Sequence, residues 1–324
     1  MFELTLTKAT TAFAIFAGIY VLRKVLVRRF DYTKIDLQGK VAIVTGSNDG
    51  IGKATALVLA KQRCKVYLFC RDSEKSRNAL RTIREESAND QVHLIPVDFA
   101  DLGSIRSAAD RFLSQESKLN ILINNAAVLL ATRQLTESGL EMQFAVNHLA
   151  PFYLTELLLP TLKASSPARI VNVSSAVAKL ATLDFSDMDM EKSYGMMRAY
   201  QRSKLCNILH VKYLDRMLQG AGVTANACHP GGVHTGLLGR DFLKTYPWTW
   251  PLLYPLLETI QLVFFRTPEE GAMTSLYLAM DPTVEGNGGG YWDNLRRNDS
   301  FIPQANDDDL RDKLYQFSQD AVKK

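Results

Sequence analysis

The sequence is poor in the residues that build metal centres and disulfide frameworks. Its four cysteines and five histidines are scattered over 324 residues without C-x-x-C spacing. That pattern excludes a zinc ribbon or a disulfide-rich scaffold and fits a reducing compartment. Cys228, His229 and His234 are close in sequence, but no acidic or thiolate partner completes a site, so no metal is predicted.

Neither positive nor negative charge is in clear excess over most of the chain. Residues 1–36 carry a net charge of +3 out of a total of +4, which leaves the remaining residues almost neutral. A nearly neutral body excludes nucleic-acid binding, which needs a clustered basic face. The sequence has no internal repeat, and 47% of its residues are hydrophobic, so we expect a globular protein that one α/β domain can account for.

One long apolar run lies at the N-terminus. Residues 9–22 are apolar, glycine or threonine, and four basic residues follow between positions 23 and 29. Because a cleaved signal peptide carries its charge before the apolar core, this order predicts a retained anchor. A helix over residues 9–22 spans about 21 Å, short of the ~30 Å hydrocarbon core, whereas residues 4–27 are long enough if their lysines and arginines snorkel. A single span, a shallow insertion and a soluble amphipathic helix all remain open.

The anchor hypothesis also predicts organisation and location. Residues 1–36 are expected to be the anchor and its basic linker, and residues 37–324 the folded domain. If the anchor spans, the positive-inside rule places everything after it in the cytosol. The expected location is the endoplasmic reticulum or another organelle membrane, with the folded domain facing the cytosol.

A glycine-rich turn follows the first predicted strand. Residues 41–44 form a short apolar run, Gly46, Gly50 and Gly52 come next, and residues 53–61 are expected to be helical. Glycines at such a turn let the backbone approach a pyrophosphate, and the helix N-terminus offers oriented N–H groups. The alternative is an ordinary strand–helix turn.

Strands and helices then alternate along the chain. Strands are expected at residues 66–70, 92–97, 121–123, 170–173 and 223–227, with helices at 73–86, 102–113, 137–162 and 198–218. This alternation predicts an α/β fold, a doubly wound Rossmann-type parallel sheet with helices on both faces in a single domain. In such sheets the ligand crevice lies beyond the carboxyl ends of the strands.

The end of the second strand bears on the choice of cofactor. An acidic residue at this position would bind the ribose 2′-hydroxyl of NAD, whereas an arginine suits the 2′-phosphate of NADP. Arg71 therefore predicts NADP(H), and the adjacent Asp72 keeps NAD as the alternative.

Tyr200 and Lys204 lie four residues apart and so share one helix face. A free tyrosine, with a pKa near 10, is a poor base at neutral pH. An adjacent ammonium would stabilise the phenolate and lower that pKa. The spacing alone occurs often by chance, so the prediction needs the other motifs of the chain.

Five motifs occur in one order: T-G-S-N-D-G-I-G (45–52), N-N-A-A (124–127), N-V-S-S (172–175), Y-x-x-x-K (200–204) and H-P-G-G-V-H-T (229–235). In order and spacing they resemble the short-chain dehydrogenase/reductase family over roughly residues 38–295. F-A-V-N-H-L-A-P-F (144–152) and R-T-P-E-E-G-A (266–272) are similar to its retinol dehydrogenase-like branch.

The resemblance implies four catalytic residues. Tyr200 would be the acid/base on the substrate oxygen, and Lys204 would tune it and hold the nicotinamide ribose. Ser175 would hydrogen-bond the substrate oxygen. Asn147 would anchor a water that links Lys204 to solvent. Tyr194, the competing tyrosine, has no lysine four residues later and is set aside.

The resemblance also implies a set of cofactor contacts. Asp98 would contact adenine, Asn125 would brace the fourth strand, and Val233 and Thr235 would lie near the nicotinamide amide. The full predicted set is Gly46, Ser47, Asn48, Gly50, Ile51, Gly52, Arg71, Asp98, Asn125, Tyr200, Lys204, Val233 and Thr235. Ala127, Ala150 and Gly232 depart from the family pattern, and none of these changes removes a catalytic group.

A second apolar run lies at residues 246–265, within a variable segment expected at about 236–266. Its prolines exclude one straight helix, and Trp248, Trp250 and Tyr254 favour a membrane interface. We expect it to line a lipophilic substrate entrance and to touch the bilayer. A buried core segment or a homodimer face is the alternative.

Together these features predict an oxidoreductase that transfers a hydride between NADP(H) and a lipophilic alcohol/carbonyl pair. Its small-molecule substrate would be retinoid-like, a steroid or a fatty aldehyde. The alternative function is a catalytically silent, cofactor-binding scaffold or regulator with the same fold.

Overall fold

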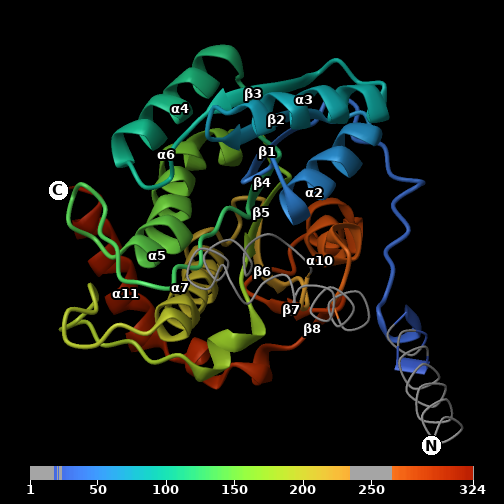
Figure 1. Cartoon of the computed structure of the whole chain (residues 1–324). Coiled ribbons are helices and arrows are strands. Elements are labelled where there is room, and N and C mark those ends of the chain that lie inside the picture. The colour runs from blue at the N-terminus through green and yellow to red at the C-terminus, as the bar shows by residue number, and fades with distance from the viewer. Residues whose placement is uncertain (1–17, 20, 22–23, 234–264, 324) are drawn as a thin grey trace, which may run out of the picture.

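The computed structural model describes residues 18–19, 21, 24–233 and 265–323 (Figure 1). Its eight strands form one sheet in the order β3-β2-β1-β4-β5-β6-β7-β8. The strands are β1 (Val41–Thr45), β2 (Lys65–Cys70), β3 (Val92–Pro96), β4 (Ile121–Asn124), β5 (Ala168–Val173), β6 (Val223–His229), β7 (Tyr291–Asp293) and β8 (Arg296–Arg297). All pairs from β3 to β7 are parallel, which confirms the predicted doubly wound sheet.

Two layers of helices cover the sheet, as predicted (Figure 1). One face carries α2 (Gly50–Lys61), α3 (Glu74–Ser87) and α10 (Pro268–Met280). The other carries α4 (Leu102–Gln115), α6 (Ala150–Ala164), α7 (Met196–Met217) and α11 (Asp308–Ala321). Alternate side chains of one strand enter different layers, since Ile43 packs on the α7 side and Val44 on the α2 side.

Short elements complete the described chain: α5 (Met142–Phe144), the π-helix η1 (Ala145–Leu149), and the 3₁₀ helices η2 (Ala176–Leu180), η3 (Pro282–Val284), η4 (Asp299–Phe301) and η5 (Pro303–Asn306). Several helices begin at capping side chains that follow strands. Asp49 accepts from Gly50 N before α2, and Ser73 accepts from Ser76 N before α3. These caps place the helix N-termini at the carboxyl edge of the sheet.

The helix predicted at residues 137–162 begins later than expected. Gly139 has a φ of +82°, and the helix begins only after Glu141, whose buried carboxylate accepts from the N–H groups of Gln143 and Phe144. The helical stretch then changes to the π-helix η1 before α6. The helix expected at 53–61 instead starts at Gly50, and neither β7 nor the antiparallel β8 was predicted.

Some predictions fall on residues that the structure does not describe. They are residues 1–17 of the anchor, Thr235, and nearly all of the variable segment, including the two tryptophans that were expected at the bilayer. Within the described ranges, none of the helices combines the length and apolar character needed to cross a bilayer.

Candidate active site

Among the described residues of the predicted site, those that follow strands lie at the carboxyl edge of the sheet, where α2 begins. The glycine loop follows β1, Asn125 follows β4, Ser175 follows β5, and Val233 lies beyond β6. Strand order reverses between β1 and β4, and ligands of doubly wound sheets bind at such a switch point.

Two glycines of the loop are required by close packing. Gly46 has a φ of +64°, and a Cβ there would lie 2.9 Å from the Cα of Ala126. A Cβ on Gly52 would lie 2.3 Å from the carbonyl oxygen of Gly46 and 2.5 Å from Asn125 Nδ2. The turn, the start of α2 and the end of β4 therefore fit together only with glycine at both positions.

Asn125 and Thr45 join the ends of β1 and β4. The hydroxyl of Thr45 accepts from the backbone N–H groups of Asn125 and Ala126, both at 2.9 Å. The side-chain amide of Asn125 donates to the carbonyl of Thr45 at 2.9 Å. These reciprocal bonds link the ends of β1 and β4 and fix the backbone around the glycine loop, while a cofactor contact of Asn125 stays a prediction.

The loop suits a phosphate group. Ser47 is fully buried, and its hydroxyl has no hydrogen-bond partner among the described residues. The N-terminus of α2 starts at this edge, where the Asp49 carboxylate caps Gly50 N and the partial positive charge of the helix is exposed to a ligand. Ile51 packs near the other end of the site, where a Cβ on Gly271 would lie 3.2 Å from its Cγ1.

The end of β2 is surrounded by cations. Arg71 is exposed immediately after the strand, Asp72 pairs with Arg77, and Lys75 pairs with Asp49. Asn48 donates to Ser76 Oγ at 3.0 Å, which ties the glycine loop to the start of α3. Asp72, the acidic residue that kept NAD as the alternative cofactor, thus forms an ion pair with Arg77.

Asp98 is exposed just beyond β3. Its backbone N–H donates to Ser104 Oγ at 2.9 Å, and its carboxylate accepts from Ala100 N at 3.0 Å. These bonds hold a tight turn at the same edge of the sheet.

The tyrosine–lysine pair lies on the first turns of α7. Lys204 is 2% exposed, and its Nζ lies 5.4 Å from the centroid of the Tyr200 ring. The same ammonium donates to the carbonyl oxygen of Val173 at 3.0 Å. The predicted shared helix face is therefore real, and a hydrogen bond to the end of β5 positions the lysine.

Burial shifts the pKa values of both groups. It raises the pKa of Tyr200 to about 12 and lowers the pKa of Lys204 to about 8, because each charged form loses solvation. The sequence-based expectation was that Lys204 would lower the pKa of Tyr200. Desolvation instead raises the pKa of Tyr200, and the Lys204 ammonium donates to the backbone carbonyl of Val173.

The two serines after β5 have different environments. Ser174 is buried, and its hydroxyl donates to the carbonyl of Lys204 at 2.6 Å. Ser175 is partly exposed, and its hydroxyl accepts only a long bond, 3.5 Å, from Val177 N at the start of η2. The second serine is thus the one available to a ligand, and the first fastens β5 to α7.

Asn147 lies in the π-helix η1, an irregularity that is frequent at functional sites. Its side chain accepts from Val128 N at 2.7 Å and donates to Val128 O at 2.9 Å. It also donates to Ser203 Oγ at 3.1 Å, next to Lys204 on α7. Three bonds thus join η1, the loop that follows β4, and α7.

Arg266 and Gly271 complete the far side of the site, and the sequence reasoning gave neither a role. Arg266 pairs through its backbone with Val233, and its Nη1 donates to the carbonyl of Pro230 at 3.1 Å. A Cβ on Gly271 would lie 2.7 Å from Val233. Both belong to the R-T-P-E-E-G-A motif, which was noted only as a feature of the branch.

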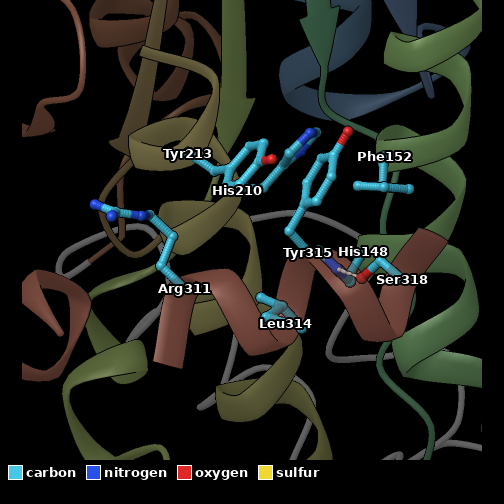
Figure 2. A pocket seen from close by; sticks show the side chains of 8 residues that line it. All are labelled: His148, Phe152, His210, Tyr213, Arg311, Leu314, Tyr315 and Ser318. Atoms are coloured by element: carbon cyan, nitrogen blue, oxygen red, sulfur yellow. Dashed lines mark hydrogen bonds between the residues drawn. The ribbon is translucent and has the colours of Figure 1, made fainter. Parts of the chain in front are cut away.

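A separate pocket lies beneath α11 (Figure 2). Its lining residues are His148, Phe152, His210, Tyr213, Arg311, Leu314, Tyr315 and Ser318. Tyr213 stacks on Tyr315 with centroids 3.6 Å apart, and the His148 ring hydrogen-bonds Ser318 Oγ at 2.9 Å. The pocket leaves no space for a water molecule, so it is a packing feature.

Comparisons with known proteins agree with this geometry. The profile of the short chain dehydrogenase family matches residues 40–244. Mouse retinol dehydrogenase 11 is 44% identical over 84% of this chain and 83% of its own length. Human retinol dehydrogenase 13 is 41% identical over 87% and 84%. A crystal structure of an uncharacterized protein from Mycobacterium paratuberculosis superposes with a TM-score of 0.70 and 28% identity, over 91% of this chain and 98% of that one.

Proposed function

The chain belongs to the short-chain dehydrogenase/reductase family, in its retinol dehydrogenase-like branch, and on this premise we propose that it reduces a lipophilic aldehyde or ketone with NADPH. Membership makes it an NAD(P)-dependent oxidoreductase that acts on CH–OH and C=O groups. The single observation that carries the proposal is the Tyr200–Lys204 pair on α7, held beside the end of β5 by the Lys204–Val173 hydrogen bond.

Each catalytic residue has a role in this proposal. Ser175 and Tyr200 hold the substrate oxygen, and Tyr200 donates a proton to it. Lys204 returns the proton to Tyr200 and holds the cofactor ribose, while Asn147 keeps η1 against α7 and anchors a water. The nicotinamide, when bound, supplies the hydride.

The reductive direction rests on the choice of NADP(H), which a reducing cytosol holds mainly in its reduced form. Tyr200 serves either direction, as the proton donor in reduction and as the proton acceptor in oxidation. Burial raises its pKa to about 12, because the charged phenolate loses solvation.

The cations after β2 support NADP(H) over NAD(H). The 2′-phosphate is dianionic near neutral pH, and a guanidinium binds such a group through charge-assisted hydrogen bonds. Arg71 follows β2 directly, and Lys75 is drawn toward the glycine loop by Asp49. Gly46, Ser47, Asn48, Gly50, Ile51 and Gly52 would hold the pyrophosphate, with Asp98, Asn125, Val233 and Thr235 along the rest of the cofactor.

The substrate class and the membrane tether extend the proposal. The relatives are named retinol dehydrogenases, which favours a retinoid-like substrate over a steroid or fatty aldehyde. Residues 1–36 would anchor the protein to an organelle membrane such as that of the endoplasmic reticulum, and residues 37–324 would face the cytosol. Residues 246–265 would contact the bilayer, or form a homodimer face instead.

The proposal is tested by following the oxidation of NADPH and NADH with retinal, a steroid ketone and an aliphatic aldehyde. We expect turnover with NADPH and at least one carbonyl compound, and a fall of about 10²–10⁴-fold in the Tyr200→Phe protein. Full turnover by Tyr200→Phe would refute the assignment. Tight NADPH binding without oxidation over the whole panel would favour the silent scaffold.

A further inference from the structure

The segment that links the N-terminal apolar run to the domain is bonded to the body. Leu26 accepts a hydrogen bond at its carbonyl from Asn294 Nδ2 at 3.0 Å. The backbone N–H of Arg28 donates to Asn294 Oδ1, also at 3.0 Å. Val27, between them, is only 8% exposed. One side-chain amide thus binds the carbonyl before and the N–H after a buried valine.

Asn294 is placed for this role by the turn between β7 and β8. It directly follows the carboxyl end of β7 and has a φ of +49°, a conformation that asparagine tolerates better than most residues. Its Oδ1 also accepts from Arg266 Nη2 at 3.4 Å, and Arg266 in turn donates to the carbonyl of Pro230. Asn294 therefore connects the linker to the loop that carries Val233 at the candidate active site.

Two further contacts fix the linker. Lys24 pairs with Glu270, whose carboxylate also accepts from Thr267 N in the capping box of α10. The ring of Phe30 packs edge-on against Tyr277 of the same helix, with centroids 5.4 Å apart. The linker is thus held at the first turn of α10, which meets the carboxyl edge of the sheet, and again two turns along the helix.

The outer surface of this linker is apolar and basic. Val21, Val25 and Leu26 are 59%, 75% and 62% exposed, and they are three of the few large hydrophobic side chains exposed among the described residues. Arg28 and Arg29 are exposed next to them. Apolar side chains flanked by arginines suit the boundary between acyl chains and anionic headgroups. Val21 belongs to the apolar run of residues 9–22, and Val25 and Leu26 follow it after two basic residues.

We infer that residues 24–30 hold the domain in one fixed orientation on a lipid bilayer, with the carboxyl edge of the sheet facing the membrane and Asn294 as the joint. The inference rests on the proposed membrane tether and adds to it an orientation. A lipophilic carbonyl compound would then reach Tyr200 from the bilayer, on the side of the molecule where the linker emerges.

The test uses the full chain on vesicles of phosphatidylcholine and phosphatidylserine. All four native cysteines are buried, so an environment-sensitive dye can be attached selectively to an introduced cysteine. Arg296→Cys reports on the carboxyl edge, and Ser117→Cys, exposed before β4, is the matched control at the opposite edge. We expect quenchers carried on lipids to reduce the Arg296→Cys signal several-fold more than the Ser117→Cys signal.

Removing the Asn294 hydrogen bonds to the linker should abolish the difference in quenching between the two edges. Asn294→Gly keeps the positive φ available but removes both bonds to the linker, and Asn294→Asp removes only the donor to Leu26. We expect either change to bring quenching at Arg296→Cys down toward that at Ser117→Cys, with vesicle binding retained. Equal quenching at both edges of the unaltered chain, or quenching that both Asn294 variants leave unchanged, overturns the fixed orientation alone. Failure of the full chain to bind vesicles overturns the tether as well.

Discussion

Burial sets the protonation state of both members of the Tyr200–Lys204 pair. The pKa of Tyr200 is raised to about 12 and that of Lys204 is lowered to about 8. Their four-residue spacing was readable from the sequence, because a helix brings such positions to one face. The hydrogen bond from Lys204 to Val173 was not, because it joins residues 31 positions apart on different elements.

The lowered pKa of Lys204 predicts the pH dependence of reduction. The ammonium is present below about pH 8 and is lost as pH rises through that value, since burial favours the neutral amine. We expect kcat/KM for carbonyl reduction to be flat near neutrality and to fall about tenfold per pH unit above the lysine pKa. Stopped-flow or steady-state rates across this range, with NADPH affinity as the control, measure it. A rate that stays flat to pH 10 would contradict the role of Lys204.

A second prediction at the residue scale concerns Arg71. Its guanidinium lies exposed after β2, and a hydrogen bond to a charged group is worth about 1.5–3 kcal/mol. Arg71→Ala should therefore raise the KM for NADPH roughly 10- to 100-fold and leave the KM for NADH nearly unchanged. Arg81→Ala, an exposed arginine further along α3 that bonds Asn78, is the matched control. Equal loss with both cofactors would assign Arg71 a structural role.

At the scale of the elements, α11 packs over two buried histidines. His148 of η1 and His210 of α7 are each almost fully buried, with ring centroids 6.1 Å apart (Figure 2). Burial lowers the pKa of His210 to about 3 and that of His148 well below its usual value. Both helices that carry candidate catalytic residues thus depend on neutral imidazoles beneath α11.

This packing predicts sensitivity to mild acid. The unfolded chain protonates His210 near pH 6.5, whereas the folded chain does so only near pH 3, so stability is full above pH 6.5 and is lost as pH falls below it. At about pH 5 the loss from His210 alone is on the order of 2 kcal/mol. Urea unfolding at neutral pH and near pH 5 should show it. His210→Gln should reduce this difference, and His93→Gln, at a half-buried position on β3, should reduce it less. An unchanged difference in His210→Gln would contradict the prediction.

At the scale of the whole molecule, the candidate site joins segments from most of the chain. The glycine loop, Asn125, Ser175 and Val233 follow four parallel strands that end at one edge, and α7 brings Tyr200 to them. A ligand that binds this edge therefore stabilises the fold as a unit. Such coupling follows from binding to the native state and not to the unfolded chain.

Thermal unfolding measures this coupling. At a concentration 100 times its Kd, NADPH should stabilise the native state by about 2.7 kcal/mol, and NADH at equal concentration should do less. Scanning calorimetry with each cofactor gives the comparison, and adenosine is the matched control ligand. A shift that is equal for NADPH and NADH would argue against discrimination at Arg71. No shift with either would argue against cofactor binding at this edge.

The sequence by itself determined the α/β fold, the parallel sheet and the motif residues, because strand–helix alternation and short-range spacing are local properties. The π-helix at Asn147, the burial that sets the pKa values of Tyr200 and Lys204, and the Asn294 joint were decided only by the tertiary structure. Each depends on contacts between residues far apart in the chain. Desolvation and long-range hydrogen bonds arise only when the packed elements exclude water, and no local pattern encodes that environment.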